Sequence, residues 1–223
     1  MVLHAIHCSP ATVIARASAR GLGPAPLILL TGVVSLVLGQ LTAVGQGSLP
    51  DQLASLANSS GPWILVTFLL ALLARGPAVA AGAGSVSLGL LLAGYVLADW
   101  ARGYPSSHAM IAFWALAALL AGPVIGLAGY GARRAGRTAA AWSVGVVPGL
   151  LAGEGLYGVT VVSATTSPVY WWAEMGAGLA VLVGLVGARK LAAVETLLSL
   201  GAAAATAAVF VLAYSADLIT AFS

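Results

Sequence analysis

Charged residues are scarce in this chain of 223 residues. Asp, Glu, Lys and Arg make up 7% of it, against about a quarter in soluble domains. Hydrophobic residues make up 61%, and the mean hydropathy is +1.03. So few charges cannot cover a water-exposed surface, and the composition therefore predicts an all-α integral membrane protein. No polar stretch is long enough to fold separately, so we expect a single domain.

Cysteine is almost absent, which excludes an intrachain disulfide, because Cys8 is the only one. His4, His7 and Cys8 are close together, but on a terminal tail, and we expect no metal and no other cofactor there. The net charge of +3 would ordinarily favour anionic partners. The densest basic cluster, within 133–137, is too small to indicate nucleic-acid binding.

Long blocks without any charge divide the chain into membrane spans. About 20 apolar residues in a helix cross the roughly 30 Å of bilayer hydrocarbon. The blocks predict a bundle of about seven transmembrane helices, at 26–46, 61–74, 77–98, 108–129, 139–162, 170–188 and 196–214. The second span is short and must borrow residues from 52–60 or tilt little, so six spans is the alternative.

The positive charges predict the orientation of these spans. With the N-terminus in the cytoplasm, eight of the nine basic residues fall on the cytoplasmic side: Arg16, Arg20, Arg75, Arg133, Arg134, Arg137, Arg189 and Lys190. Only Arg102 falls outside, where Asp99, Glu154 and Glu174 are its possible partners. We therefore expect a tail with a short interfacial helix at 1–25, a membrane domain at 26–216 and an outer C-terminal tail at 217–223.

Glu154 is the one ionisable residue well inside a predicted span. An acid at that depth is a functional candidate, because it costs several kcal/mol unless it is paired, solvated or protonated. Pro148 and the glycines around the acid, among them Gly153 and Gly155, predict a loosened or broken helix. Transporters build binding sites from such discontinuous helices. The alternative is a structural acid that fixes helix packing.

Four further residues are candidate ligand contacts of the same pocket. Tyr157 shares a helical face with Glu154, and Gln40 lies at a similar depth, as its hydrogen-bond partner or as a second contact. Asn58 and Trp63 come from the outer loop and the start of the second span. Trp63 also fits a belt of interfacial aromatic residues, as do Trp100, Tyr104, Tyr170, Trp171 and Trp172; some of these rings could instead line the pocket. Glu174 is expected to be an interfacial charge.

Glycines recur at four-residue spacing in two predicted spans, as Gly145, Gly149 and Gly153 and as Gly122 and Gly126. Such stripes let helix backbones approach closely. They predict a tightly packed bundle with the fifth span near its centre, and they are too common in an Ala- and Gly-rich chain to indicate a dimer.

A short motif, Pro105-Ser106-Ser107-His108, resembles the Pro-Ser-Gly-His element of membrane-bound phosphatidic-acid-type phosphatases. That chemistry needs a second histidine as nucleophile, and no histidine follows His108. We therefore expect no enzyme, and Ser106 or Ser107 as the N-cap of the fourth span. The chain also lacks a lysine inside the last span, as a retinal protein would need.

Five short motifs stand out over about residues 28–190: Leu49-Pro50, 55–59 with Pro62-Trp63, Ala101–Tyr104, Phe113-Trp114 with Gly122-Pro123, and Gly153–Tyr157. In these motifs the chain resembles an uncharacterised family of small bacterial polytopic membrane proteins. Size and span number are similar to the substrate-binding subunits of energy-coupling-factor transporters. The first resemblance implies no activity, and the second implies capture of a small ligand from the outer face.

These observations predict a protein of a bacterial inner membrane that binds or transports a small ligand in an outward-facing pocket around Glu154. A buried carboxylate selects a cation, an amine or a proton. The alternative is a non-catalytic scaffold or accessory subunit in which Glu154 is structural. Expected partners are the lipid bilayer, the small-molecule ligand, and a partner subunit or further copies of the chain.

Overall fold

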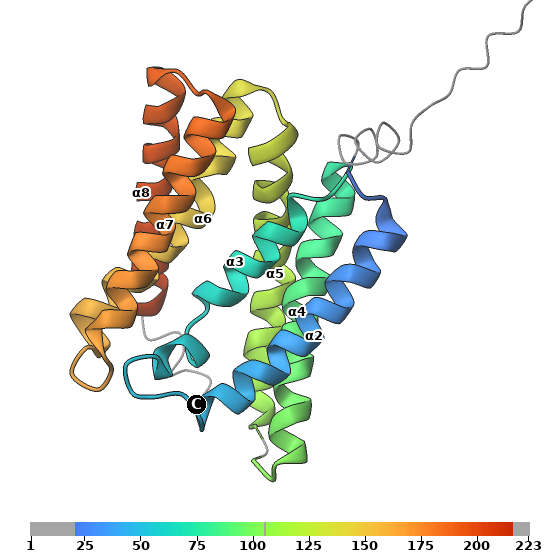
Figure 1. Cartoon of the computed structure of the whole chain (residues 1–223), viewed down its shortest axis with the longest axis vertical. Coiled ribbons are helices and arrows are strands. Elements are labelled where there is room, and N and C mark those ends of the chain that lie inside the picture. Colours follow the sequence, from blue (N-terminus) through green and yellow to red (C-terminus); the bar gives the residue numbers. More distant parts are fainter. Residues whose placement is uncertain (1–20, 105, 216–223) are drawn as a thin grey trace, which may run out of the picture.

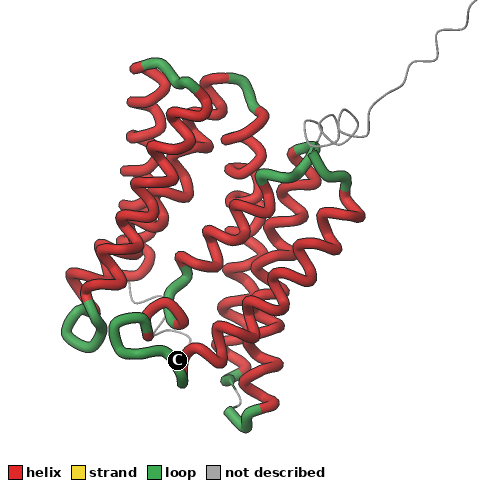
Figure 2. Tube along the Cα trace, in the orientation of Figure 1, coloured by secondary structure: helices red, strands yellow, loops and turns green. Residues whose placement is uncertain are grey.

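The computed structural model describes residues 21–104 and 106–215, and this part of the chain consists of helices joined by loops, without a β-strand (Figure 2). A short 3-10 helix, Ala54–Ala57, precedes α3, and a π-helix, Gly158–Val162, continues α6. The α-helices are α2 (Pro24–Gln46), α3 (Gly61–Ala71), α4 (Pro77–Ala101), α5 (His108–Arg134), α6 (Arg137–Tyr157), α7 (Pro168–Arg189) and α8 (Ala193–Ser215).

Six of these helices are long and apolar enough to cross a membrane, namely all except α3. Their outward faces carry large apolar side chains, such as Leu29, Leu119 and Val183, which are 71%, 63% and 62% exposed. In water this surface would be strongly unfavourable, whereas in lipid it needs no partner. The predicted class, a helical membrane protein, is confirmed.

Successive helices run in opposite directions along the bundle, and α3 takes part in this alternation (Figure 1). The start of α2 and the end of α3 meet at one end, where Leu22 N donates to Leu73 O (2.7 Å) and Arg75 N donates to Leu22 O (3.0 Å). Residues 21–215 therefore make seven passes along the bundle, of which six are long helices.

The second pass is only half helical. At 1.5 Å per residue, the 11 residues of α3 cover about 16 Å, roughly half of the hydrocarbon thickness. The other half is the irregular segment 47–60, whose residues Ser55, Ala57 and Ser59 are buried in the bundle. Irregular backbone at membrane depth is tolerated where protein buries it or where it lines a cavity. The second span was predicted at 61–74 as a short one that must borrow residues from 52–60; its helix ends at Ala71, and residues of the segment before it complete the pass.

The basic residues gather at the end of the bundle where α2 begins. Arg133 Nη1 donates to Leu72 O (3.1 Å), Arg189 Nη2 donates to Ala135 O (2.6 Å), and Arg137 pairs with Glu195. Arg133 and Arg189 thus hold neighbouring helix ends together through bonds to backbone carbonyls, and Arg137 does so through an ion pair. The described cations that the sequence assigned to one side thus share one end, and which side of the membrane that end faces stays a prediction.

The opposite end carries Arg102, which pairs with Asp99 (2.6 Å) and also donates to Ala43 O (2.6 Å). The structure thereby chooses among the three acids that the sequence left open. Arg16, Arg20 and the expected interfacial helix lie outside the described residues.

Close backbone packing builds two groups of three helices, α2–α4–α5 and α6–α7–α8, which α5–α6 contacts and α3 connect. A Cβ added at Gly145, Gly149 or Gly153 would collide with the α8 backbone, and one at Gly122 or Gly126 would collide with α4. The prediction that these glycines serve close helix packing is confirmed, and α6 is the most buried of the six long helices.

Candidate functional site

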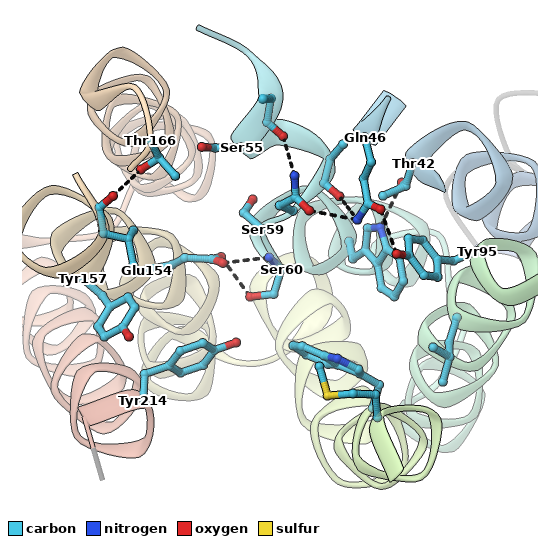
Figure 3. Close-up of a pocket in the computed structure, with 18 of the residues that line it drawn as sticks. Thr42, Gln46, Ser55, Ser59, Ser60, Tyr95, Glu154, Tyr157, Thr166 and Tyr214 are labelled. Carbon is cyan, nitrogen blue, oxygen red and sulfur yellow. Dashed lines mark hydrogen bonds between the residues drawn. The ribbon is translucent and has the colours of Figure 1, made fainter. Parts of the chain in front are cut away.

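A cavity of about 1050 Å³ lies at the end of the bundle opposite the basic loops. All seven α-helices and the segment 54–60 contribute to its lining, so it sits where the two helix groups meet (Figure 3). The described polar and aromatic residues that line it are Thr42, Gln46, Asp51, Ser55, Asn58, Ser59, Ser60, Trp63, Tyr95, Ser106, Ser107, Trp114, Glu154, Tyr157, Thr165, Thr166, Ser167, Trp171 and Tyr214.

Glu154 lines this cavity and is 5% exposed. The Ser60 N–H donates to Glu154 Oε1 (2.7 Å), and the Ser60 hydroxyl donates to Oε2 (2.9 Å). Ser60 directly precedes α3, so the carboxylate faces the N-terminus of that half helix. The free N–H groups and the dipole of a helix N-terminus favour negative charge, which explains how an acid is held about 26 Å along α6.

A second acid, Glu174 on α7, lies beside the first. It is 6% exposed, and its carboxylate packs against Gly61 at the start of α3. Glu154 and Glu174 are close enough to interact electrostatically. Within the described residues, no N–H or hydroxyl group donates to either oxygen of Glu174. The expectation that Glu174 is an interfacial charge is wrong, because α7 carries it into the contact with α3 and α6.

Aromatic rings form much of the cavity wall around Glu154. Tyr157 and Tyr214 pack edge to face with ring centroids 5.4 Å apart, and Trp63 and Tyr95 do so at 6.2 Å. Figure 3 shows Tyr157 and Tyr214 on the same side of the cavity as Glu154. The aromatic faces and the carboxylate therefore surround one space.

The wall across from Glu154 is a hydrogen-bonded polar network. Gln46 donates to Asn58 Oδ1 (2.9 Å) and accepts from the Tyr95 hydroxyl (2.8 Å), while Trp63 Nε1 donates to Thr42 Oγ1 (3.1 Å). These bonds hold the irregular segment against α2 and α4, whereas the Ser60–Glu154 bonds hold it to α6. The segment thus links both helix groups at the cavity.

The structure brings together four of the five predicted site residues, since Glu154, Tyr157, Asn58 and Trp63 all line the cavity. Gln40 does not, and its predicted place is wrong. The face of α2 that packs into the bundle includes Gly39 and Ala43, so Gln40 points away and is exposed.

Ser60, Gln46, Tyr95, Tyr214 and Glu174 were missed. Ser60 had a signal, since Ser59-Ser60-Gly61-Pro62 is typical of a helix start. Tyr214 had none, because nothing in the sequence brings the end of α8 to the middle of α6. The aromatic residues divide as the sequence left open: Trp63 and Trp171 line the cavity, whereas Trp100, Tyr104 and Trp172 are 73%, 67% and 62% exposed.

The helix around Glu154, predicted to be loosened or broken, is not broken there, because α6 continues as an α-helix to Tyr157 and changes to a π-helix only at Gly158. A Cβ at Gly153 would meet α8, and one at Gly155 would meet Trp171 and Met175 of α7. These glycines therefore serve close packing. The irregularities near the acid are the N-terminus of α3 and the π-helix Gly158–Val162, a feature frequent at functional sites.

Ser107 and His108 have the expected structural place at the start of α5. The Ser107 hydroxyl accepts from Met110 N (3.2 Å) as the N-cap, and His108 is the first, exposed residue of the helix. In the described part of the chain, no group of three or more His, Cys, Asp and Glu side chains is arranged to hold a metal ion.

A comparison with family models matches residues 18–219 to a "Family of unknown function (DUF6518)". The chain belongs to this family. The match extends past the segments from which a family of uncharacterised membrane proteins was inferred, and it covers the whole cavity. No curated protein and no solved structure matches the chain, so the similarity to energy-coupling-factor subunits finds no support.

Proposed function

We propose that this membrane protein binds a small organic cation, such as an amine or a quaternary ammonium compound, in the cavity beside Glu154. The observation that carries this proposal is the combination of charge and rings in the lining. Among the described lining residues, two are acids, six are Trp or Tyr, and none is basic. A cation gains from a carboxylate and from aromatic faces, whereas an anion would meet only repulsion and neutral dipoles.

Transport is the use of such a cavity that the architecture favours. The acid faces the N-terminus of a half helix at the meeting of two helix groups, and transporters place their sites at discontinuous helices between bundles that move relative to one another. The bacterial inner membrane, with the cavity open to the outer face, is the setting that we propose for this function.

A second function, a non-catalytic scaffold, is favoured by one specific observation. Both oxygens of Glu154 already accept hydrogen bonds from Ser60. An acid used in this way would fix α3 against α6 without any ligand. The two functions differ in whether a cation competes for the carboxylate. In neither of them does the protein act as an enzyme.

A thermal-shift screen separates these functions. Purified protein is heated with primary amines and quaternary ammonium salts, each compared with a neutral alcohol of the same shape. A ligand at 100 times its Kd adds about 2.7 kcal/mol to the stability of the folded state. If the protein binds a cation, one class of cations should raise the Tm, and the neutral alcohols of the same shape should leave it unchanged. A screen in which cations and alcohols act alike would favour the scaffold.

A further inference from the structure

Glu174 has a role that the cation cavity alone does not explain. It is not among the residues that line the cavity, and its side chain lies behind the start of α3, against Gly61. The carboxyl group is buried, with 6% exposed, and no described donor reaches it. An isolated carboxylate in such surroundings is strongly unfavourable, and burial is tolerated when the group is neutralised.

Among the residues that the structure describes, the groups that face Glu174 offer no positive charge. On α6 it faces Glu154, and on α8 the nearest titratable group is Tyr214. Tyr170, one turn earlier on α7, bonds to Ser59. Neither α3 nor the π-helix contributes a titratable side chain at this point. Glu154 and Glu174 therefore form a pair of acids that nothing described neutralises, apart from the Ser60 donors on Glu154.

We infer that Glu174 carries a proton in the empty protein, and that this proton is exchanged for the cation that binds beside Glu154. Without ligand the pair holds one proton and one negative charge. When a cation enters, the pair loses its proton and carries two negative charges, one of which the cation balances. The proton passes from the pair to solvent by way of Glu154, the member that lines the cavity. The net charge of the site is therefore unchanged. This inference rests on the proposed function and adds cation–proton exchange to it.

Gly61 leaves room for Glu174 at the start of α3, the same helix end that bonds to Glu154. A Cβ at this position would collide with Glu174 Oε1, so the absence of a side chain allows the carboxyl group to reach the N-terminus of α3. The same N-terminus bonds to Glu154 through Ser60. The positive end of this helix dipole favours the negative charge that Glu174 gains when its proton leaves.

Calorimetry tests the exchange with tetraethylammonium as the probe. Titration of the purified full-length protein in several buffers of different ionisation enthalpy gives the number of protons released per bound cation. The inference expects about one proton for the wild type and none for Glu174→Gln, whose side chain has the same shape. It also expects wild-type binding to weaken by up to about tenfold for each unit by which the pH falls, because acid keeps the pair protonated.

Infrared spectroscopy of the unliganded protein is the second measurement. The wild type should show the C=O stretch of a neutral, buried carboxylic acid, which Glu174→Gln should lose. Glu195→Gln is the matched control and should keep it, because Glu195 belongs to an ion pair at the other end of the bundle.

The outcomes separate the inference from the proposed function. Probe binding without proton release, or without the infrared band, overturns the exchange and leaves the cavity proposal intact. A band with no binding of any cation overturns the proposed function and the exchange with it. Because the wild type alone gives both readings, a Glu174→Gln variant that fails to fold does not prevent the decision.

Discussion

At Ser60, a backbone N–H and a side-chain hydroxyl both donate to one carboxylate. The bonds to Glu154 join α3 to α6 at a carboxylate that is 5% exposed. Buried donors left without an acceptor cost about 1–3 kcal/mol each. Replacement of the acid by an apolar residue therefore lowers the stability of the protein as well as removing the charge.

The first prediction compares two substitutions of Glu154. Glu154→Leu should lower the free energy of unfolding by about 1–3 kcal/mol, because the Ser60 donors lose their acceptor. Glu154→Gln keeps one acceptor oxygen and should lose less than about 1 kcal/mol. Unfolding in detergent titrated with SDS measures both values. If Leu is as stable as the wild type, the Ser60–Glu154 bonds do not hold α3 in place.

The second prediction concerns Gly61, where there is no room for a side chain. Gly61→Ala should destabilise the protein by about 1–3 kcal/mol, because the new methyl group forces Glu174 to move. Gly176→Ala on α7 is the control, since a Cβ there meets nothing within 4 Å. The control should match or exceed the wild type in Tm. Equal stability of the two variants would show that the Glu174 side chain can move aside without loss of stability.

At the scale of helices, α3 shows why an apolar block does not define a span by itself. Hydropathy identified residues 61–74 as apolar, and the six long helices agree with their predicted ranges to within a few residues at most ends. Where α3 begins is decided by tertiary bonds, since Ser60 bonds to Glu154, 94 residues away. A pattern of local hydrophobicity contains no information on such a bond.

The sequence predicted those site residues whose signal lies in their own stretch of the chain. Glu154 stood out because an acid inside a span is rare, and Tyr157 followed from helical spacing. Gln40 was wrong because depth in the membrane does not tell which face of a helix points inward. Glu174 was misjudged for the related reason that distance from a span end does not report burial by a neighbouring half helix. The depth of a residue in the membrane can be predicted from the sequence. Which helix face points inward, and which residues it contacts, depend on how the helices pack.

The third prediction tests the packing of α6 against α8. A Cβ at Gly149 would collide with Ala203 and Thr206, whereas one at Gly201 would meet nothing within 4 Å. Gly149→Ala should therefore cost about 1–3 kcal/mol of stability and broaden the unfolding transition. Gly201→Ala should leave stability within about 1 kcal/mol of the wild type. Thermal unfolding followed by circular dichroism provides the comparison, and equal losses would mean that α6 and α8 adjust freely.

For the molecule as a whole, the distribution of charge gives it two different ends. One end is closed by basic side chains that bond to loop carbonyls, and the other holds the cavity and the Asp99–Arg102 pair. Positive charge is retained on the cytoplasmic side of membrane proteins. The cavity is then expected to open to the outer face.

The fourth prediction follows from this asymmetry. Reporter fusions after residue 135, at the basic end, and after residue 223 should give opposite signals, with residue 135 in the cytoplasm. The reason is the seven-pass path, in which α3 and the segment before it together count as one crossing. Two cytoplasmic signals would mean that this half-helical pass does not cross the membrane.

Equilibrium binding of a cation to the wild type and to Glu154→Gln tests the central claim most directly. The ligand is the organic cation with the largest thermal shift, and dialysis against purified protein gives its Kd without any assay of transport. The cavity model predicts saturable binding of one cation per chain, weakened at least about tenfold in Glu154→Gln although this variant is folded. Binding of the same strength to both proteins, or no saturable binding to the wild type, would contradict it.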